Sequence, residues 1–326
     1  MRFDDVSYSL RNLAWHTLYG LKLNDRFGKI LLGYRDEPGR RWSPNVVQST
    51  LDWLGRESDR PFFAFLNIYD PHAEYCVEEP YRSRFAAQPR PPRNLLERWR
   101  HRWTPVEVSA QTEAYDGAVS MADESIGRLL AELDSRGLLR NTLVIVTSDH
   151  GEEFLEHGFL GHWNSLYWEV LHVPLILNWQ GRLPEGRRIA QPVGIDSMPA
   201  TVLALLNRPA PASFAGPSLE PFWRDGPSPT ESRMVISEIV PQGGMPAKSL
   251  AARGWMKSIV HGDWHYVLHE KLGEELFHRP TDPLEKTNRV KQPEAQEVLK
   301  QMRGEIARRF PALQRAAAQP PGPRRP

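Results

Sequence analysis

The fold of this chain is decided by one stretch of its sequence, Asn141-Thr142-Leu143-Val144-Ile145-Val146-Thr147-Ser148-Asp149-His150-Gly151. Its first half is apolar on both faces, which is typical of a strand inside a covered sheet. The run 62–69 shares this pattern, 173–179 is a third candidate strand, and a long helical pattern spans 105–136. Strand, helix and strand in this order predict a right-handed crossover onto a parallel sheet. We therefore expect an α/β fold, with a mostly parallel sheet covered by helices on both faces. Residues 62–69 and 143–147 should be fully buried in it as parallel neighbours or near-neighbours.

The rest of the chain divides around this core. A helix is predicted from Ser43, as N-cap, to about Ser58, with Pro44 at its first position. Short strands are predicted at 234–240, 255–260 and 264–268, and an amphipathic helix over 295–310 would cover them. We expect five segments: an irregular N-terminal segment 1–42, an incomplete α/β core 43–208, a linker 209–230, a small α+β sub-domain 231–311 and a disordered tail 312–326.

Composition excludes several classes of protein. The 326 residues hold 41 Lys plus Arg against 40 Asp plus Glu, a formal charge of +1, so we expect no nucleic-acid partner. The single cysteine, Cys76, excludes an internal disulfide framework. No apolar run approaches the length of a membrane span. The start, Met1 to Asp5, carries acid where a secretory leader would be basic, so we expect a soluble, cytoplasmic chain as written. The sequence leaves the oligomeric state open.

Two predicted strands end in residues that can do chemistry. Asp149 and His150 follow one strand and precede Gly151, so they can offer a carboxylate and an imidazole to one divalent cation. The alternative is that Asp149 caps a helix with Glu152 as its partner. His72 follows the other strand in Asp70-Pro71-His72, where the alternative is a surface turn.

Histidines gather around these strand ends. His157 and His162 lie within thirteen residues of Asp149, so four of the eleven histidines fall near the two strand ends, counting His72 and His150. Ligands of open parallel sheets bind beyond the carboxyl ends of the strands. This clustering indicates a site there.

The order of these motifs resembles the sulfatase family of the alkaline phosphatase-like superfamily. The resemblance rests on the residues 61–63 with 70–75, 147–152, 156–158, 161–162, 165–169, 173–175, 253–260, 275–277, 282–285 and Asn288. It covers roughly residues 43 to 290 in consistent order. One such motif would be weak evidence for the family, but several in the same order along the chain are specific evidence for it.

The resemblance implies a metal-dependent sulfuric ester hydrolase. Asp149 and His150 match metal ligands of the family. His72 matches a histidine that contacts the sulfate oxygens, and His162 matches a residue that contacts sulfate or assists the leaving group. The implied cofactor is a divalent metal, Ca²⁺ first, with Mg²⁺ or Mn²⁺ as alternatives. The implied substrate is a sulfated small molecule or a sulfated glycan. The side chains of His72, Asp149, His150 and His162 should then lie within about 10 Å of a common centre, with His157 in a supporting or structural role.

The family's nucleophile has no match in this sequence. It is a cysteine or serine in a Cys/Ser-x-Pro-x-Arg pentapeptide, whereas Cys76 has neither the proline nor the arginine at that spacing. Asp4-Asp5 is the only adjacent acidic pair near the start, and the three residues before it are too few for a central strand. We therefore expect a chain that begins after the family's catalytic first segment, as a truncated product, a fragment or a part completed by another chain, with little or no catalysis alone.

Two other functions stay open. A phosphoesterase or phosphonate hydrolase of the same superfamily shares the metal ligands. A non-catalytic pseudo-enzyme or binding module would keep the sheet and the C-terminal sub-domain for contact with a partner.

Overall fold

The computed structural model describes residues 42–56, 60–73, 75, 77–86, 103–162, 164–224, 233–241 and 249–311. They fall into two compact units, Met1–Arg140 and Asn141–Pro326, and each is described by itself. The predicted irregular start, the predicted tail from 312, Asp4-Asp5 and Cys76 lie outside the described residues. The predicted domain boundaries stay a prediction.

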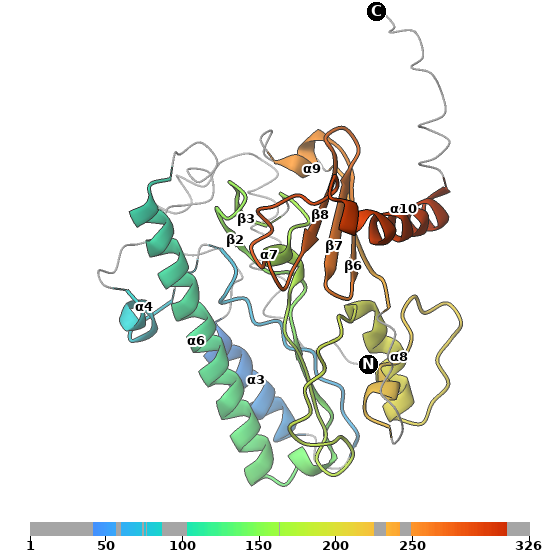
Figure 1. The fold of residues 1–326 in the computed structure, drawn as a ribbon. Coiled ribbons are helices and arrows are strands. Elements are labelled where there is room, and N and C mark those ends of the chain that lie inside the picture. Colours follow the sequence, from blue (N-terminus) through green and yellow to red (C-terminus); the bar gives the residue numbers. More distant parts are fainter. Residues whose placement is uncertain are drawn as a thin grey trace, which may run out of the picture. The chain divides into compact units, whose positions relative to one another are not determined.

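The described part of the first unit is built on two long helices, both predicted from the sequence (Figure 1). Helix α3 spans Ser43–Leu54 and lies beside α6, which spans Pro105–Ser135, and the short α4 spans Tyr81–Arg84. Helix α6 begins with a capping box, in which Thr104 and Glu107 satisfy each other's backbone amides. Gly137 follows its end with a φ of 69°, a conformation that favours glycine.

The start of α3 differs from the prediction by one residue and in its chemistry. The N-cap is Trp42, and Ser43 is already helical. The Ser43 amide instead donates to the carboxylate of Asp70, at 3.1 and 3.2 Å from its two oxygens. Asp70 is fully buried. A residue 27 positions away therefore satisfies the first amide of the helix, which a local capping rule does not detect.

The segment Phe62–Tyr69 is not a strand, so the prediction that it lies parallel to 143–147 in one sheet is wrong. Among the described residues no strand pairs with it, and the side chains of Phe63 and Phe65 are 81% and 82% exposed. An apolar pattern shows that a segment could be covered on both faces, but a strand also needs a hydrogen-bonding neighbour.

The second unit begins with the strand of the opening stretch. Strand β1, Val144–Thr147, pairs antiparallel with β4, Leu175–Asn178. Both strands are at most half-buried, so the prediction that 143–147 is fully buried is wrong. Between them lie a hairpin of β2, Glu153–Phe154, and β3, Leu160–Gly161, and then helix α7, Trp168–Leu171. The predicted strand at 173–179 is confirmed, and its described partner runs antiparallel to it.

The C-terminal part of the second unit contains a four-stranded sheet. Its four antiparallel strands follow in sequence order: β5 Val235–Ile239, β6 Met256–His261, β7 Trp264–His269 and β8 Gly273–His278. The first three were predicted, and β8 was not. The remaining helices are α8 Met198–Leu205, α9 Leu250–Arg253 and α10 Gln296–Arg309, with short 3₁₀ turns at Leu139–Asn141, Ile195–Ser197, Glu220–Phe222 and Pro293–Ala295.

Both faces of this sheet are covered. On one face Ile259, Tyr266 and Leu276 are cross-strand partners and pack against Leu299 and Met302 of the predicted helix α10. The other face packs against the segment that leads into α7, through the buried side chains Leu166, Tyr167, Met256, Val267 and Phe277. The sheet therefore fixes the position of α7 and of the residues beside it.

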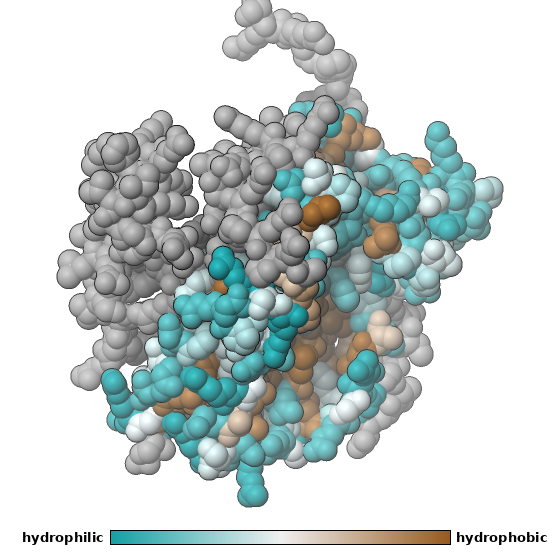
Figure 2. Space-filling model, turned by 90° about the vertical axis from the view of Figure 1, so that its left-hand side faces the viewer, coloured by the Kyte–Doolittle hydropathy of each residue, from teal (hydrophilic) through white to brown (hydrophobic). Residues whose placement is uncertain are grey.

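Within the described residues, no helix is long and apolar enough to cross a membrane. On the face drawn in Figure 2, hydrophilic residues cover most of the coloured surface, and hydrophobic groups are visible between them.

Candidate functional site

The first site residues stand where β1 ends. His150 donates its backbone amide to Asp149 Oδ1 at 3.1 Å, and His150 Nε2 lies 3.8 Å from the same oxygen. The Asp149 side chain is 88% exposed and that of His150 is 28% exposed. No helix begins here, so the alternative interpretation of Asp149 as a helix cap is wrong. A carboxylate and an imidazole therefore lie side by side at a strand end, as the sequence predicted.

The His150 ring is oriented by its own backbone. Its Nδ1 lies 2.8 Å from the carbonyl oxygen of Gly151. Nδ1 must carry the proton to donate to a carbonyl, which leaves Nε2 as the nitrogen with the lone pair. This is the arrangement that metal-binding histidines commonly have.

His162, the residue directly after strand β3, joins this pair. Its ring stacks on that of His150, with centroids 3.9 Å apart and planes at 27°. Its Nδ1 lies 3.1 Å from Glu152 Oε1, and the two side chains are 8% and 4% exposed. Two of the predicted histidines are thus brought together. Glu152, which the sequence suggested only as a capping partner, contacts His162 instead, and sequence reasoning missed this contact.

Gly151 connects the strand end to helix α7. Its amide donates to the Val170 carbonyl at 2.8 Å. A Cβ at this position would lie 2.0 Å from the Glu169 carbonyl oxygen. Only glycine therefore allows the two backbones to approach this closely. The glycine of the Asp-His-Gly motif is explained by packing.

His72 belongs to the first unit and lies in a turn. Its amide donates to the Tyr69 carbonyl at 3.1 Å, and its ring stacks on Tyr69 with centroids 4.3 Å apart. Its Nδ1 lies 2.7 Å from the Ala73 carbonyl oxygen, and the side chain is half-buried. Its predicted convergence with Asp149, His150 and His162 stays a prediction.

The C-terminal signature ties a loop to the second sheet. Glu285 is buried, with Oε1 2.5 Å from His265 Nδ1, and its Oε2 accepts the Trp168 amide at 3.0 Å. Asp282 accepts the amides of Lys286 and Thr287, and Asn288 accepts that of Leu276. Asp282, Glu285 and Asn288 thus each bind backbone amides of this loop, of β8 or of α7.

The residues at the end of β1 fit a divalent cation in part. Asp149 supplies an exposed carboxylate and His150 a correctly oriented ring nitrogen. Divalent metals accept such a mixed set of ligands. Two ligands do not complete a coordination sphere, so the described residues supply part of a site at this strand end.

A family model described as Sulfatase matches residues 8–208. The chain belongs to the sulfatase family. Human arylsulfatase D is 34% identical over 232 residues, which is 64% of this chain and 34% of that protein. The multifunctional alkaline phosphatase superfamily protein PehA of Trinickia caryophylli is 27% identical over 232 residues, which is 60% of this chain and 44% of that protein. The chain thus spans less than half the length of these two relatives.

The sulfatase fold is also found by comparison with solved structures. The phosphonate monoester hydrolase of Agrobacterium radiobacter superposes with a TM-score of 0.68 at 22% sequence identity, covering 95% of this chain and 69% of that chain. The predicted recognition of the family and the α/β, alkaline phosphatase-like fold class are therefore confirmed. The family generally uses a divalent metal.

Proposed function

We propose that this chain serves the hydrolysis of a sulfate ester, with Asp149 and His150 as ligands of a divalent cation and His162 and His72 as contacts to the sulfate. The observation that carries the proposal is the cluster at the end of β1. There the His150 ring lies against both the Asp149 carboxylate and the His162 ring. All of these residues lie within the part of the chain that matches the sulfatase family.

The chemistry of a sulfate ester suits these side chains. A bound divalent cation neutralises the oxygens of the sulfate group. His162 is held at Nδ1 by the Glu152 carboxylate, which keeps the ring in one orientation with its other nitrogen facing away from that carboxylate. From there it can donate to a sulfate oxygen or protonate the departing oxygen of the alcohol.

The cation that we propose is Ca²⁺, with Mg²⁺ and Mn²⁺ as alternatives. A carboxylate is a hard ligand that calcium prefers, and sites with few protein ligands bind it weakly, at about 10⁻⁴–10⁻³ M. We propose a sulfated small molecule or a sulfated glycan as the substrate.

We expect binding without turnover in the 326-residue chain. Its sequence has no Cys/Ser-x-Pro-x-Arg segment, and Cys76 is its only cysteine. A sulfatase without the residue that attacks sulfur loses covalent catalysis.

Calcium titration and an aryl sulfate assay test the proposal together. We expect calorimetry to detect weak Ca²⁺ binding that is lost in Asp149→Asn and kept in Asp134→Asn, an exposed carboxylate on α6. With 4-nitrophenyl sulfate and calcium, release of nitrophenol should stay at background. Absence of Ca²⁺, Mg²⁺ and Mn²⁺ binding would favour the non-catalytic module. Turnover that survives Asp149→Asn would contradict the assignment of the ligands.

A competition experiment distinguishes a sulfatase from the alternative, a phosphate or phosphonate ester hydrolase. Inorganic sulfate and phenyl phosphonate both carry oxygens around a tetrahedral centre, but the two anions differ in charge. We expect sulfate to protect His162 from diethyl pyrocarbonate at lower concentration than the phosphonate. The reverse order would favour the alternative.

A further inference from the structure

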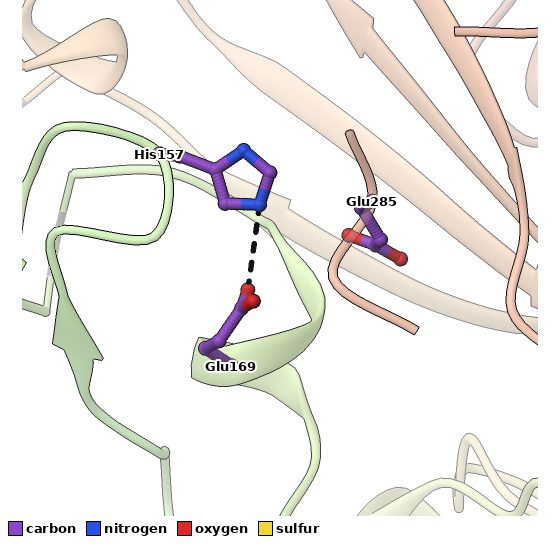
Figure 3. A group of neighbouring side chains, drawn as sticks. All are labelled: His157, Glu169 and Glu285. Carbon is purple, nitrogen blue, oxygen red and sulfur yellow. Dashed lines mark ion pairs between the residues drawn. The ribbon is translucent and has the colours of Figure 1, made fainter. Parts of the chain in front are cut away.

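We propose that His157, Glu169 and Glu285 form a second metal site, separate from Asp149 and His150, for a divalent first-row transition metal such as Zn²⁺. His157 lies in the loop between β2 and β3, Glu169 lies in α7, and Glu285 lies in the loop after β8 (Figure 3). Each residue offers one ligand atom, and these atoms all lie within 4.8 Å of one another. Three elements of the second unit thus converge on one point.

The distance between two of these residues is that of two ligands and not of a hydrogen bond. His157 Nε2 lies 3.6 Å from Glu169 Oε2. Nitrogen–oxygen hydrogen bonds have distances of about 2.7–3.2 Å. A tetrahedral zinc with bonds of about 2.1 Å holds its ligand atoms roughly 3.4 Å apart. The observed separation therefore matches a shared ion.

Burial makes the cluster costly without a cation. The His157 side chain is 9% exposed and that of Glu169 is 13% exposed. His157 Nε2 and both oxygens of Glu169 are buried and have no hydrogen-bond partner among the described residues. A buried polar atom without a partner costs about 1–3 kcal/mol, and a charged one costs more. One divalent cation would satisfy all three atoms.

Burial lowers the pKa of His157 to about 4, with Lys286 adding to the effect. Burial also raises the pKa of Glu169. The proposal rests on the geometry and burial of the three side chains.

Neighbouring side chains hold two of the three ligands in place. The Tyr167 ring stacks on that of His157, with centroids 3.6 Å apart and planes at 11°, and its hydroxyl donates to Glu275 at 2.9 Å. Glu285 lies against His265, whose Nε2 is in turn 2.7 Å from Ser258 Oγ. Metal ligands are typically oriented by such partners, so the cluster is organised before any ion binds.

The ligand set indicates the class of metal. One imidazole and two carboxylates suit zinc and its first-row neighbours. The competing explanation is a proton shared between His157 and Glu169, which would need no ion.

Zinc uptake by the whole chain distinguishes these two explanations. Asp149→Ala and His150→Ala are introduced first, so that the strand-end residues cannot contribute to the result, and the chain is purified without a histidine tag and stripped with EDTA. We expect one equivalent of Zn²⁺ by elemental analysis after dialysis, and no displacement by a tenfold excess of Ca²⁺. No uptake of zinc would overturn the proposal and favour the shared proton.

A matched pair of variants locates the ion. In the same background, Glu169→Gln keeps the shape of the side chain and should weaken zinc binding by about 100-fold or more, because even changes to outer partners cost 10- to 100-fold. Glu294→Gln, at an exposed carboxylate, should leave binding unchanged. His157→Gln should act like Glu169→Gln, and circular dichroism checks that each variant folds. Equal zinc affinity in Glu169→Gln and Glu294→Gln would overturn the site, whatever the fate of calcium binding at Asp149.

Discussion

At the scale of single residues, the carboxylate of Glu152 orients the imidazole ring of His162. The sequence offered Glu152 as part of a helix cap, but no helix begins at Asp149, and the next described element is β2. The carboxylate turns instead to His162, ten positions on, at 3.1 Å. The pairing of β2 with β3 makes this contact possible. Glu153 pairs with Gly161, and this brings their neighbours Glu152 and His162 together.

Glu153, the next residue, carries a testable consequence for pH. Its side chain is fully buried, and burial raises its pKa to about 8, with the carboxylate of Glu169 adding to the effect. The folded chain keeps this proton between about pH 4.5 and 8, while the unfolded chain loses it. The free energy of unfolding therefore falls as pH rises through this window, by about 3–5 kcal/mol from this group.

We expect Glu153→Gln, which stays neutral, to remove this dependence. Urea unfolding in EDTA should show the variant close to wild type at pH 5 and increasingly more stable than wild type up to pH 8.5. Glu294→Gln serves as the exposed control. A stability difference between Glu153→Gln and wild type that does not change with pH would show that Glu153 does not hold its proton in the folded chain.

Among the elements, the contact between the end of β1 and α7 is the most sensitive to a small change. We expect Gly151→Ala to lower the free energy of unfolding by about 1–3 kcal/mol. The added carbon would lie 2.0 Å from a backbone oxygen, which cannot swing away as a side chain would. Gly304 has nothing within 4 Å and lies inside α10, so Gly304→Ala should stabilise the chain by about 0.5–1 kcal/mol. Denaturant unfolding of both variants makes the comparison, and a Gly151→Ala chain as stable as Gly304→Ala would contradict it.

Helices were the elements best predicted from the sequence. The limits of α6 and α10 follow from local signals, a capping box and an apolar stripe, which act over one or two turns. Strand pairing depends on a second segment far along the chain. The apolar pattern at 62–69 therefore suggested a strand and could not reveal that no described strand pairs with it.

In the candidate sites, too, contacts between residues adjacent in sequence could be predicted, and contacts between distant residues could not. Asp149 and His150 are adjacent in sequence, so their proximity needed no fold. The stacking of His162 on His150 needed the hairpin. The His157, Glu169 and Glu285 cluster joins residues up to 128 positions apart, and Glu285 enters it only because β8 and the loop after it return to α7. No periodicity in the sequence carries that information.

For the molecule as a whole, the balanced charge and the exposed apolar side chains both affect how strongly copies of the chain associate. A formal charge of +1 gives copies of the chain little mutual repulsion. Exposed phenylalanines add attraction, since large apolar side chains on a surface favour association. Solution behaviour therefore depends on where these side chains lie.

The extended segment 61–68 has a consequence for self-association. It reads Pro-Phe-Phe-Ala-Phe-Leu-Asn-Ile, has no charge, and exposes Phe63 and Phe65 without a strand partner among the described residues. Uncharged apolar segments with open backbone edges template cross-β aggregation. We expect Phe63→Lys with Phe65→Lys to lengthen the lag before thioflavin T fluorescence rises, and Phe85→Lys, at a half-exposed phenylalanine beside α4, to leave it unchanged. Equal lag times in the two variants would mean that aggregation starts elsewhere in the chain.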